Sequence, residues 1–297
     1  FHLFRAMITL NKKGVFEMSQ QKPAFSTAAT ARHILVCLLL FLAGDLLSSL
    51  AFDLLFAVAR PPAPWLYQLP RALGALALTW ALFRLYAARG LRLGMAEFGV
   101  TFSLRGWAVA ASVLLPVLVA AAFLPLGEVS VTRGGPGEVL GMLAVSLAFA
   151  LKAGVTEELL FRGFLMKLVD WRWGKRAAIL LPSVLFASAH LFQLGSAGPG
   201  EVLLLVLGGS LVGIMFSLVA DRSGSVSNSV LMHTLWNLVM ATSLLHITPA
   251  GETYGSPVFS LIIPDGPLLL TGGSFGAETS AIAMAGYAAV CCLALVK

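Results

Sequence analysis

Long runs of apolar residues, with few polar interruptions, dominate the chain. We count eight such runs, and most approach the ~20 residues that a helix needs to cross about 30 Å of hydrocarbon. A transmembrane β-barrel would instead show segments of about ten residues that alternate in polarity. The pattern therefore predicts eight transmembrane helices, at residues 33–59, 70–88, 107–126, 139–168, 177–195, 202–220, 226–247 and 280–296.

The composition supports the same class of protein. Hydrophobic residues make up 58% of the chain and charged residues only 11%, whereas soluble domains average about half apolar and a quarter charged. Such an apolar surplus cannot be buried behind a water-facing surface, which excludes a soluble enzyme, a coiled coil and a disordered chain. We expect an all-α, multi-pass integral protein of the cell membrane, surrounded by the lipid bilayer.

The positions of the positive charges predict the orientation. With a cytoplasmic N-terminus, 15 of the 20 lysines and arginines fall on inside segments and 3 in outside loops, as the positive-inside rule requires. The bias predicts that both termini are cytoplasmic. It also accounts for the net charge of +6, so no nucleic acid partner is expected.

The chain divides into two predicted parts. Residues 1–32 form a polar, basic N-terminal segment, and residues 33–297 form the polytopic membrane domain, with a core at about 139–247 that carries the candidate chemistry. Residues 248–279 contain no lysine or arginine and are rich in glycine and proline. We interpret this stretch as an extracytoplasmic loop without strong regular structure.

Ionisable side chains within the predicted spans mark candidate chemistry, because each costs about 2.5–3.5 kcal/mol at the centre of a membrane helix. Three clusters combine polar or aromatic residues at a spacing of four. On a helix this spacing places both residues of a pair on one face. The pairs are Glu158 with Arg162, Phe186 with His190, and His233 with Asn237, and Glu157 precedes the first pair.

The first cluster predicts one paired and one free carboxylate. Glu158 and Arg162 can form an ion pair along one face, in which both groups stay charged despite the low dielectric. Glu157 lies about 100° further around the helix. It is therefore the carboxylate that can face a water-filled cavity.

The other two clusters supply imidazole and amide groups. His233 and Asn237 would lie side by side and are suited to hold a carbonyl oxygen or a metal ion. His190 brings a second imidazole from another span. Phe186 lies one turn from His190 and can fix its ring by packing.

An acid, two imidazoles and an amide in one membrane site suit hydrolysis. Glu157 would act as general base on a water that His190 helps to hold. His233 and Asn237 would stabilise the oxyanion of the tetrahedral intermediate, an effect worth about 3–4 kcal/mol per donor in soluble proteases. We assign no serine as a nucleophile, so an acyl-enzyme is not expected.

A metal-dependent reaction is the alternative mechanism. Glu157, His190 and His233 are a possible set of zinc ligands, but the His-Glu-x-x-His pattern of helix-borne metalloprotease sites is absent. We therefore expect that no cofactor is required and predict no metal site, with zinc as the open alternative.

The three clusters, in this order, resemble the CAAX-protease and bacteriocin-processing family. This family includes type II CAAX prenyl endopeptidases and lysostaphin-resistance-protein-A-like membrane proteins, and its pattern is Glu-Glu-x-x-x-Arg, then Phe-x-x-x-His, then His-x-x-x-Asn or Asp. The resemblance covers about residues 139–247 and implies an intramembrane endopeptidase with eight helices. Carried over by position, it implies that Glu157 and His190 activate water, that His233 and Asn237 form the oxyanion site, and that Glu158 and Arg162 support the geometry.

The resemblance implies a membrane-bound protein or peptide as substrate. Trimming of a prenylated C-terminus, maturation of a peptide or bacteriocin, and immunity all remain open. A non-catalytic membrane scaffold or immunity protein that keeps the polar cluster for structure is the second hypothesis. A small transporter that uses Glu157 and the histidines as a proton relay is the third, and the absence of a clear internal repeat disfavours it.

Two observations do not fit this scheme easily. Measured from the inner ends of the predicted spans, Glu157 would lie about 16 Å deep, His190 about 20 Å and His233 about 10 Å, although one site needs one depth. Asp45 and Asp53 lie on one face of the first span, and we assign no chemical role to either.

Overall fold

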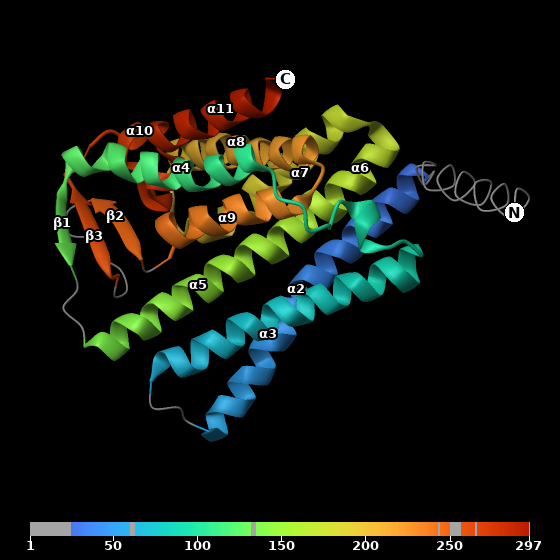
Figure 1. The fold of residues 1–297 in the computed structure, drawn as a ribbon, viewed down its shortest axis with the longest axis horizontal. Coiled ribbons are helices and arrows are strands. Elements are labelled where there is room, and N and C mark those ends of the chain that lie inside the picture. Colours follow the sequence, from blue (N-terminus) through green and yellow to red (C-terminus); the bar gives the residue numbers. More distant parts are fainter. Residues whose placement is uncertain are drawn as a thin grey trace, which may run out of the picture.

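The protein is a bundle of long helices with a small sheet at one end (Figure 1). The computed structural model describes residues 25–59, 63–131, 135–242, 244–249, 257–264 and 266–296. Most of the predicted N-terminal segment, residues 1–24, lies outside the described residues. The helices are α2 (Thr27–Ala59), α3 (Pro64–Leu85), α4 (Gly106–Phe123), α5 (Pro136–Glu158), α6 (Met166–Trp173), α7 (Lys175–Ala189), α8 (Pro199–Ser223), α9 (Val226–Met240), α10 (Leu268–Thr271) and α11 (Ala281–Leu295).

Single turns of other helical types join or extend these helices. Two are π-helical and the others are 3₁₀ turns. The π-helical segments are η1 (Tyr86–Leu91) and η4 (Leu159–Leu165), and the 3₁₀ turns are η2 (Met95–Phe98), η3 (Leu124–Leu126), η5 (His190–Gln193), η6 (Gly273–Phe275) and η7 (Ala277–Thr279).

Five of the described helical segments are long and apolar enough to cross a membrane. They coincide with the first, third, fourth, fifth and sixth predicted spans. The second, seventh and eighth predicted spans correspond to α3, α9 and α11; α9 and α11 have 15 residues each. The structure thus supports a multi-pass membrane protein, while the count of eight spans and the orientation of the termini stay predictions. The five segments are Thr27–Ala59, Gly106–Leu126, Pro136–Trp173, Lys175–Gln193 and Pro199–Ser223.

The described residues are mostly helical, as the sequence predicts, but they also contain a small sheet, and the expectation that 248–279 lacks strong regular structure is wrong. Strands β1 (Glu128–Val131), β2 (Leu245–Pro249) and β3 (Phe259–Ile263) form one sheet in the order β1-β3-β2. β3 pairs antiparallel with β1 and parallel with β2. The central strand reads Phe-Ser-Leu-Ile-Ile, a composition that favours strand, but its partner β1 lies far away in the sequence and no local pattern reveals the pairing.

The outer surface of α2 fits a lipid environment. Leu46 is 67% exposed and Val58 is 85% exposed, and such apolar exposure along a whole helix is typical of contact with acyl chains rather than water. The two aspartates of this helix are both paired. Asp45 forms an ion pair with Lys152 of α5, and Asp53 accepts a hydrogen bond from Tyr67 of α3. Their role is therefore to join α2 to its neighbours.

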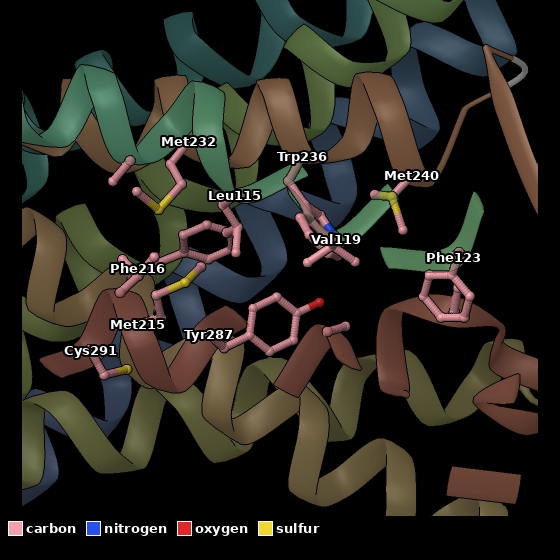
Figure 2. Packing of buried hydrophobic residues seen from close by; sticks show 14 of the residues in the cluster. Leu115, Val119, Phe123, Met215, Phe216, Met232, Trp236, Met240, Tyr287 and Cys291 are labelled. Carbon is pink, nitrogen blue, oxygen red and sulfur yellow. The ribbon is translucent and has the colours of Figure 1, made fainter. Parts of the chain in front are cut away.

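The main apolar core lies between α4, α8, α9 and α11. Figure 2 shows its larger side chains facing one another across these four helices. This core fixes one side of α9, and two predicted site residues, His233 and Asn237, each directly follow a residue of the core. Its labelled members are Leu115, Val119, Phe123, Met215, Phe216, Met232, Trp236, Met240, Tyr287 and Cys291.

Two glycines allow the helices that carry the site to approach closely. A methyl group added at Gly154 of α5 would lie 2.9 Å from the backbone nitrogen of Thr234 in α9. One added at Gly213 of α8 would lie 2.9 Å from the Cα atom of Ser183 in α7. Real side chains essentially never come so close to backbone atoms. The close contacts of α5 with α9 and of α7 with α8 thus depend on glycine, which has no side chain, at these two positions.

Candidate active site

The predicted site residues meet around one cavity of about 230 Å³. Glu157 reaches it from α5, His190 from η5, and His233 and Asn237 from α9. The unequal depths estimated from the sequence therefore do not keep these side chains apart. Helix α5 runs obliquely to α4 and α8 in Figure 1, so equal numbers of residues along two helices do not correspond to equal depths.

Glu158 and Arg162 form a fully buried ion pair. Arg162 Nη1 donates to Glu158 Oε1 at 2.7 Å, and neither side chain is exposed. Arg162 Nη2 donates to the backbone oxygen of Gly213 at 3.0 Å, which ties the pair to α8. The guanidinium carbon also lies 4.7 Å from the ring centre of Phe186 and 5.1 Å from that of Phe216. Charge, hydrogen bonds and ring faces together compensate the guanidinium for its loss of water.

The backbone around this pair departs from a regular helix. The π-helical segment η4 begins directly after Glu158 and contains Arg162. Insertions of this kind are frequent at functional sites, because they turn side chains away from their regular direction. The sequence predicted one continuous helix here and gave no signal for the irregular turn.

The His233 ring is held by Glu158 on one edge. Its Nδ1 lies 3.0 Å from Glu158 Oε1, and its Nε2 lies 3.9 Å from Glu157 Oε2. The ring stacks on Phe216 with centroids 4.7 Å apart and an interplanar angle of 19°. Nδ1 of His233 donates a hydrogen bond to the Glu158 carboxylate. Nε2 is therefore the ring nitrogen that faces Glu157 and the cavity.

His190 is fixed in a similar way by the backbone. Its Nδ1 lies 2.8 Å from the carbonyl oxygen of Phe186, which can only accept, so Nδ1 carries the proton. The ring also lies against the Phe186 ring, with centroids 4.6 Å apart. Phe186 thus positions His190 by packing and by its carbonyl group, and Nε2 of His190 remains as an acceptor.

Glu157, unlike Glu158, does not take part in a buried ion pair with Arg162. Its Oε2 is buried and has no hydrogen-bond partner among the described residues, although the side chain as a whole is 21% exposed. Asn237 lies one turn beyond His233 and borders the same cavity. A carboxylate and an amide therefore border a common cavity together with two imidazoles.

A comparison with known families agrees with these motifs. Residues 139–239 match the family described as Type II CAAX prenyl endopeptidase Rce1-like. Over this segment the chain is similar to the Rce1-like family. The match covers about a third of the chain and contains all three motifs. It confirms the resemblance inferred from the sequence. No curated protein and no solved structure matches the chain significantly.

The cavity also contains residues outside the Rce1-like segment that sequence analysis missed. Glu278 and Phe275 border it from η7 and η6, and Tyr287 borders it from α11. Trp236 Nε1 donates to Glu278 Oε2 at 2.7 Å. Glu278 lies in the stretch interpreted as an irregular loop, and a single acidic residue near a predicted membrane edge carries no motif that would have identified it.

A second, more apolar cavity meets the site from the side of α2. It has a volume of about 340 Å³, and Leu38, Phe41 and Leu42 of α2 line it. Glu157 and His190 border both cavities. The candidate base and the candidate water-holding histidine thus lie where a polar cavity and an apolar cavity meet.

The residues considered for zinc are Glu157, His190 and His233. Among the described residues, no group of three or more His, Cys, Asp or Glu side chains is placed to hold a metal ion. His233 directs Nδ1 at Glu158, and His190 directs Nδ1 at a backbone carbonyl. Histidines that bind zinc use their second ring nitrogen in the same way, so these two hydrogen bonds are compatible with either mechanism. The expectation that no cofactor is required stays a prediction.

Proposed function

We propose that the protein is an intramembrane peptidase that hydrolyses a peptide bond of a membrane-bound protein or peptide, with Glu157 as the base that activates water. One observation carries the proposal: Glu157, His190, His233 and Asn237, from three separate helical segments, border one cavity. The similarity of residues 139–239 to the Rce1-like family supports the same class, because CAAX proteases are hydrolases acting on peptide bonds.

Glu157 and His190 would hold the attacking water between two hydrogen-bond acceptors. A water between them donates one hydrogen to the Glu157 carboxylate and the other to His190 Nε2, which leaves a lone pair free for attack on the substrate carbonyl. Glu157 Oε2 has no hydrogen-bond partner among the residues described, and His190 Nδ1 is already bonded to Phe186. Each group therefore has one acceptor available for that water.

Two groups on α9 would stabilise the negative charge that develops on the carbonyl oxygen. Asn237 can donate from its amide, and His233 can donate from Nε2 when the ring carries both protons. The Glu158 carboxylate at Nδ1 and the Arg162 guanidinium behind it would hold the His233 ring in place. The buried ion pair has a positioning role in this scheme and does not touch the substrate.

The apolar cavity beside α2 suggests how the substrate would be bound. An extended peptide with a hydrophobic side chain or lipid group could place that group against Leu38, Phe41 and Leu42. The adjoining peptide bond would then lie near Glu157 and His190. This arrangement favours a substrate with an apolar residue or lipid-modified cysteine close to the cleaved bond, and both alternatives remain open.

The proposal is tested by a cleavage assay on purified protein in detergent, with a quenched fluorescent peptide that carries a lipid or transmembrane anchor. We expect Glu157→Ala and Glu157→Gln to lower kcat at least 100-fold, the usual effect of removing a general base. Glu138→Gln is the matched control, because Glu138 lies in the first turn of the same helix and is exposed. It should cleave at the wild-type rate.

The result also separates the peptidase from a non-catalytic scaffold. A scaffold needs only the shape and hydrogen bonding of residue 157, which glutamine preserves, so Glu157→Gln would then keep full biological function. Turnover of the wild type that does not exceed that of Glu157→Ala, on any anchored peptide, would contradict the peptidase proposal.

A further inference from the structure

A carboxyl group that lies outside the Rce1-like segment borders the cavity of the proposed active site. Glu278 belongs to η7, close to the C-terminal end of the chain, and lines the cavity together with Glu157, His190 and His233. The preceding turn reaches the same site, because the Phe275 ring lies 6.0 Å from the ring of His190. The segment 273–279 therefore forms a wall of the cavity that the three motifs leave open.

The Glu278 side chain has a defined position. Trp236 Nε1 donates to its Oε2 at 2.7 Å, and Tyr287 donates its hydroxyl proton to the backbone oxygen of Glu278 at 2.9 Å. Trp236 directly precedes Asn237 on α9. With Oε2 bound to the indole, Oε1 is the oxygen that remains for a group in the cavity.

The surroundings of Glu278 favour its neutral form. Burial raises the pKa of Glu278, and the negative charge of Glu157 acts in the same direction. The Trp236 hydrogen bond and the charges of His190 and His233 oppose this rise without cancelling it. Tyr287 of α11 faces the same residue, and Glu201 of α8 binds the neighbouring turn at Ser274. A carboxyl group with a raised pKa keeps its proton to higher pH and is therefore better suited to donate it.

We propose that Glu278 is a further catalytic residue, the general acid that protonates the leaving amine. The inference rests on the proposed peptidase function and extends it to a residue that none of the three motifs includes. It divides the work between two carboxyl groups in one cavity. Glu157 accepts a proton and Glu278 donates one, as in other hydrolytic sites with two carboxyl groups in different environments.

Glu157 and Glu278 together account for every proton that moves in the proposed reaction. The water oxygen bonds to the carbonyl carbon as one water proton passes to the Glu157 carboxylate. The carbon–nitrogen bond then breaks, and the nitrogen takes its proton from Glu278. The products are a carboxylic acid and an amine. Glu157 subsequently releases its proton to solvent and Glu278 takes one up, which restores the starting state without any further reactant.

A purely structural role is the competing explanation for Glu278. In that case the side chain would serve only to accept the Trp236 hydrogen bond and fix segment 273–279 against α9. Glutamine at position 278 would still accept this bond through its amide oxygen. The exchange of Glu278 for glutamine therefore removes the acidic proton and keeps the structural contact.

The test compares two substrates with the same acyl sequence, one with a peptide bond and one with an activated ester at the cleavage position. An amine must be protonated to leave, whereas an activated phenolate or thiolate leaves without an acid. We expect Glu278→Gln to lower kcat about 100-fold or more on the peptide and less than about fivefold on the ester. Glu157→Ala should lose both activities, since both substrates need activated water.

The pH profile provides an independent readout. A general acid must be protonated, so wild-type kcat should fall as the pH rises through the pKa of Glu278. This alkaline limb should be missing in Glu278→Gln. Trp236→Phe removes a hydrogen bond that favours the carboxylate, so it should shift the limb to higher pH. Glu201→Gln is the matched control, because Glu201 accepts from the backbone nitrogen of Ser274 at 2.7 Å but does not line the cavity.

Two results would overturn the inference while leaving the peptidase proposal intact. One is peptide cleavage by Glu278→Gln at the wild-type rate with the alkaline limb unchanged. The other is an equal loss on peptide and ester, which indicates a structural role. Failure of the wild type to cleave either substrate faster than Glu157→Ala would instead reject the proposed function, and this inference with it.

Discussion

At the scale of single residues, the candidate active site contains one buried positive charge, and its neighbours are organised around it. Arg162 has no solvent-exposed surface on its side chain, so its charge must be balanced within the protein. Glu158 supplies the opposite charge, Gly213 supplies a carbonyl, and two aromatic rings lie against the guanidinium. The same carboxylate also holds His233. Loss of Arg162 would therefore affect both stability and the proposed oxyanion site.

The first prediction concerns the stability of this buried pair. Arg162→Ala leaves Glu158 charged and buried, and breaking a buried ion pair in this way costs about 3–5 kcal/mol. The exposed pair of Lys175 with Asp221, at 3.0 Å, is the matched control. Lys175→Ala should cost less than about 1 kcal/mol. Thermal unfolding in detergent, followed by size-exclusion chromatography, measures both. Equal midpoints for the two variants would contradict the assigned role of Arg162.

The sequence could predict the paired residues because each pair is local. Glu158 and Arg162, like His233 and Asn237, lie four positions apart, and helix geometry alone then places them on one face. It could not predict which nitrogen of each histidine faces the cavity, because those orientations depend on Glu158 and on the Phe186 carbonyl across the fold. Glu278 could not be found for the same reason, since its partners Trp236 and Tyr287 come from two other helices.

At the scale of elements, the close contact of α5 with α9 brings the acids to the imidazole. Gly154 lies three residues before Glu157, and Thr234 directly follows His233. The absence of a side chain at Gly154 sets the distance between the two helices at this level. The hydrogen bond of 3.0 Å between His233 and Glu158 depends on that distance.

The second prediction tests this contact. Gly154→Ala would place a methyl group 2.9 Å from the backbone nitrogen and 3.1 Å from the Cα atom of Thr234, so α5 must move away from α9. We expect a loss of cleavage activity of at least tenfold, because small misplacements of catalytic groups are costly. Gly137→Ala is the control on the same helix, since nothing lies within 4 Å of the added methyl group. Thr234→Ala should rescue Gly154→Ala only in part, because it removes the Thr234 hydroxyl that the methyl group would meet first but leaves the backbone nitrogen and Cα atom in place.

The sheet illustrates what sequence patterns leave undetermined at this scale. The helices were predictable from long apolar runs, but strand β3 is five residues long and pairs with β1 in the register Glu128 to Ile262. Such pairing closes a loop of more than a hundred residues. No local periodicity encodes it, and the glycine and proline content of the surrounding stretch favoured a loop.

At the scale of the whole molecule, the cavity lies toward the end that carries the sheet. Its lining includes Ala241, just after α9, and Phe275 and Glu278 from the segment that follows β3. The charge bias of the sequence predicts that this end faces away from the cytoplasm. If so, water and cleaved products would exchange with the extracytoplasmic side, while the apolar cavity beside α2 adjoins a helix whose leucines are exposed.

The last prediction tests this orientation with single cysteines. In a variant whose native Cys37, Cys291 and Cys292 are replaced by alanine, a cysteine is introduced either at Ser274 or at Lys175, and both positions are exposed. An impermeant maleimide added to intact cells should label the cysteine at Ser274, because the positive-inside rule places that segment outside. The cysteine at Lys175 should be labelled only after permeabilisation. The reverse pattern would invert the molecule and place the mouth of the cavity on the cytoplasmic side, where a substrate made in the cytosol would reach Glu157 without crossing the membrane.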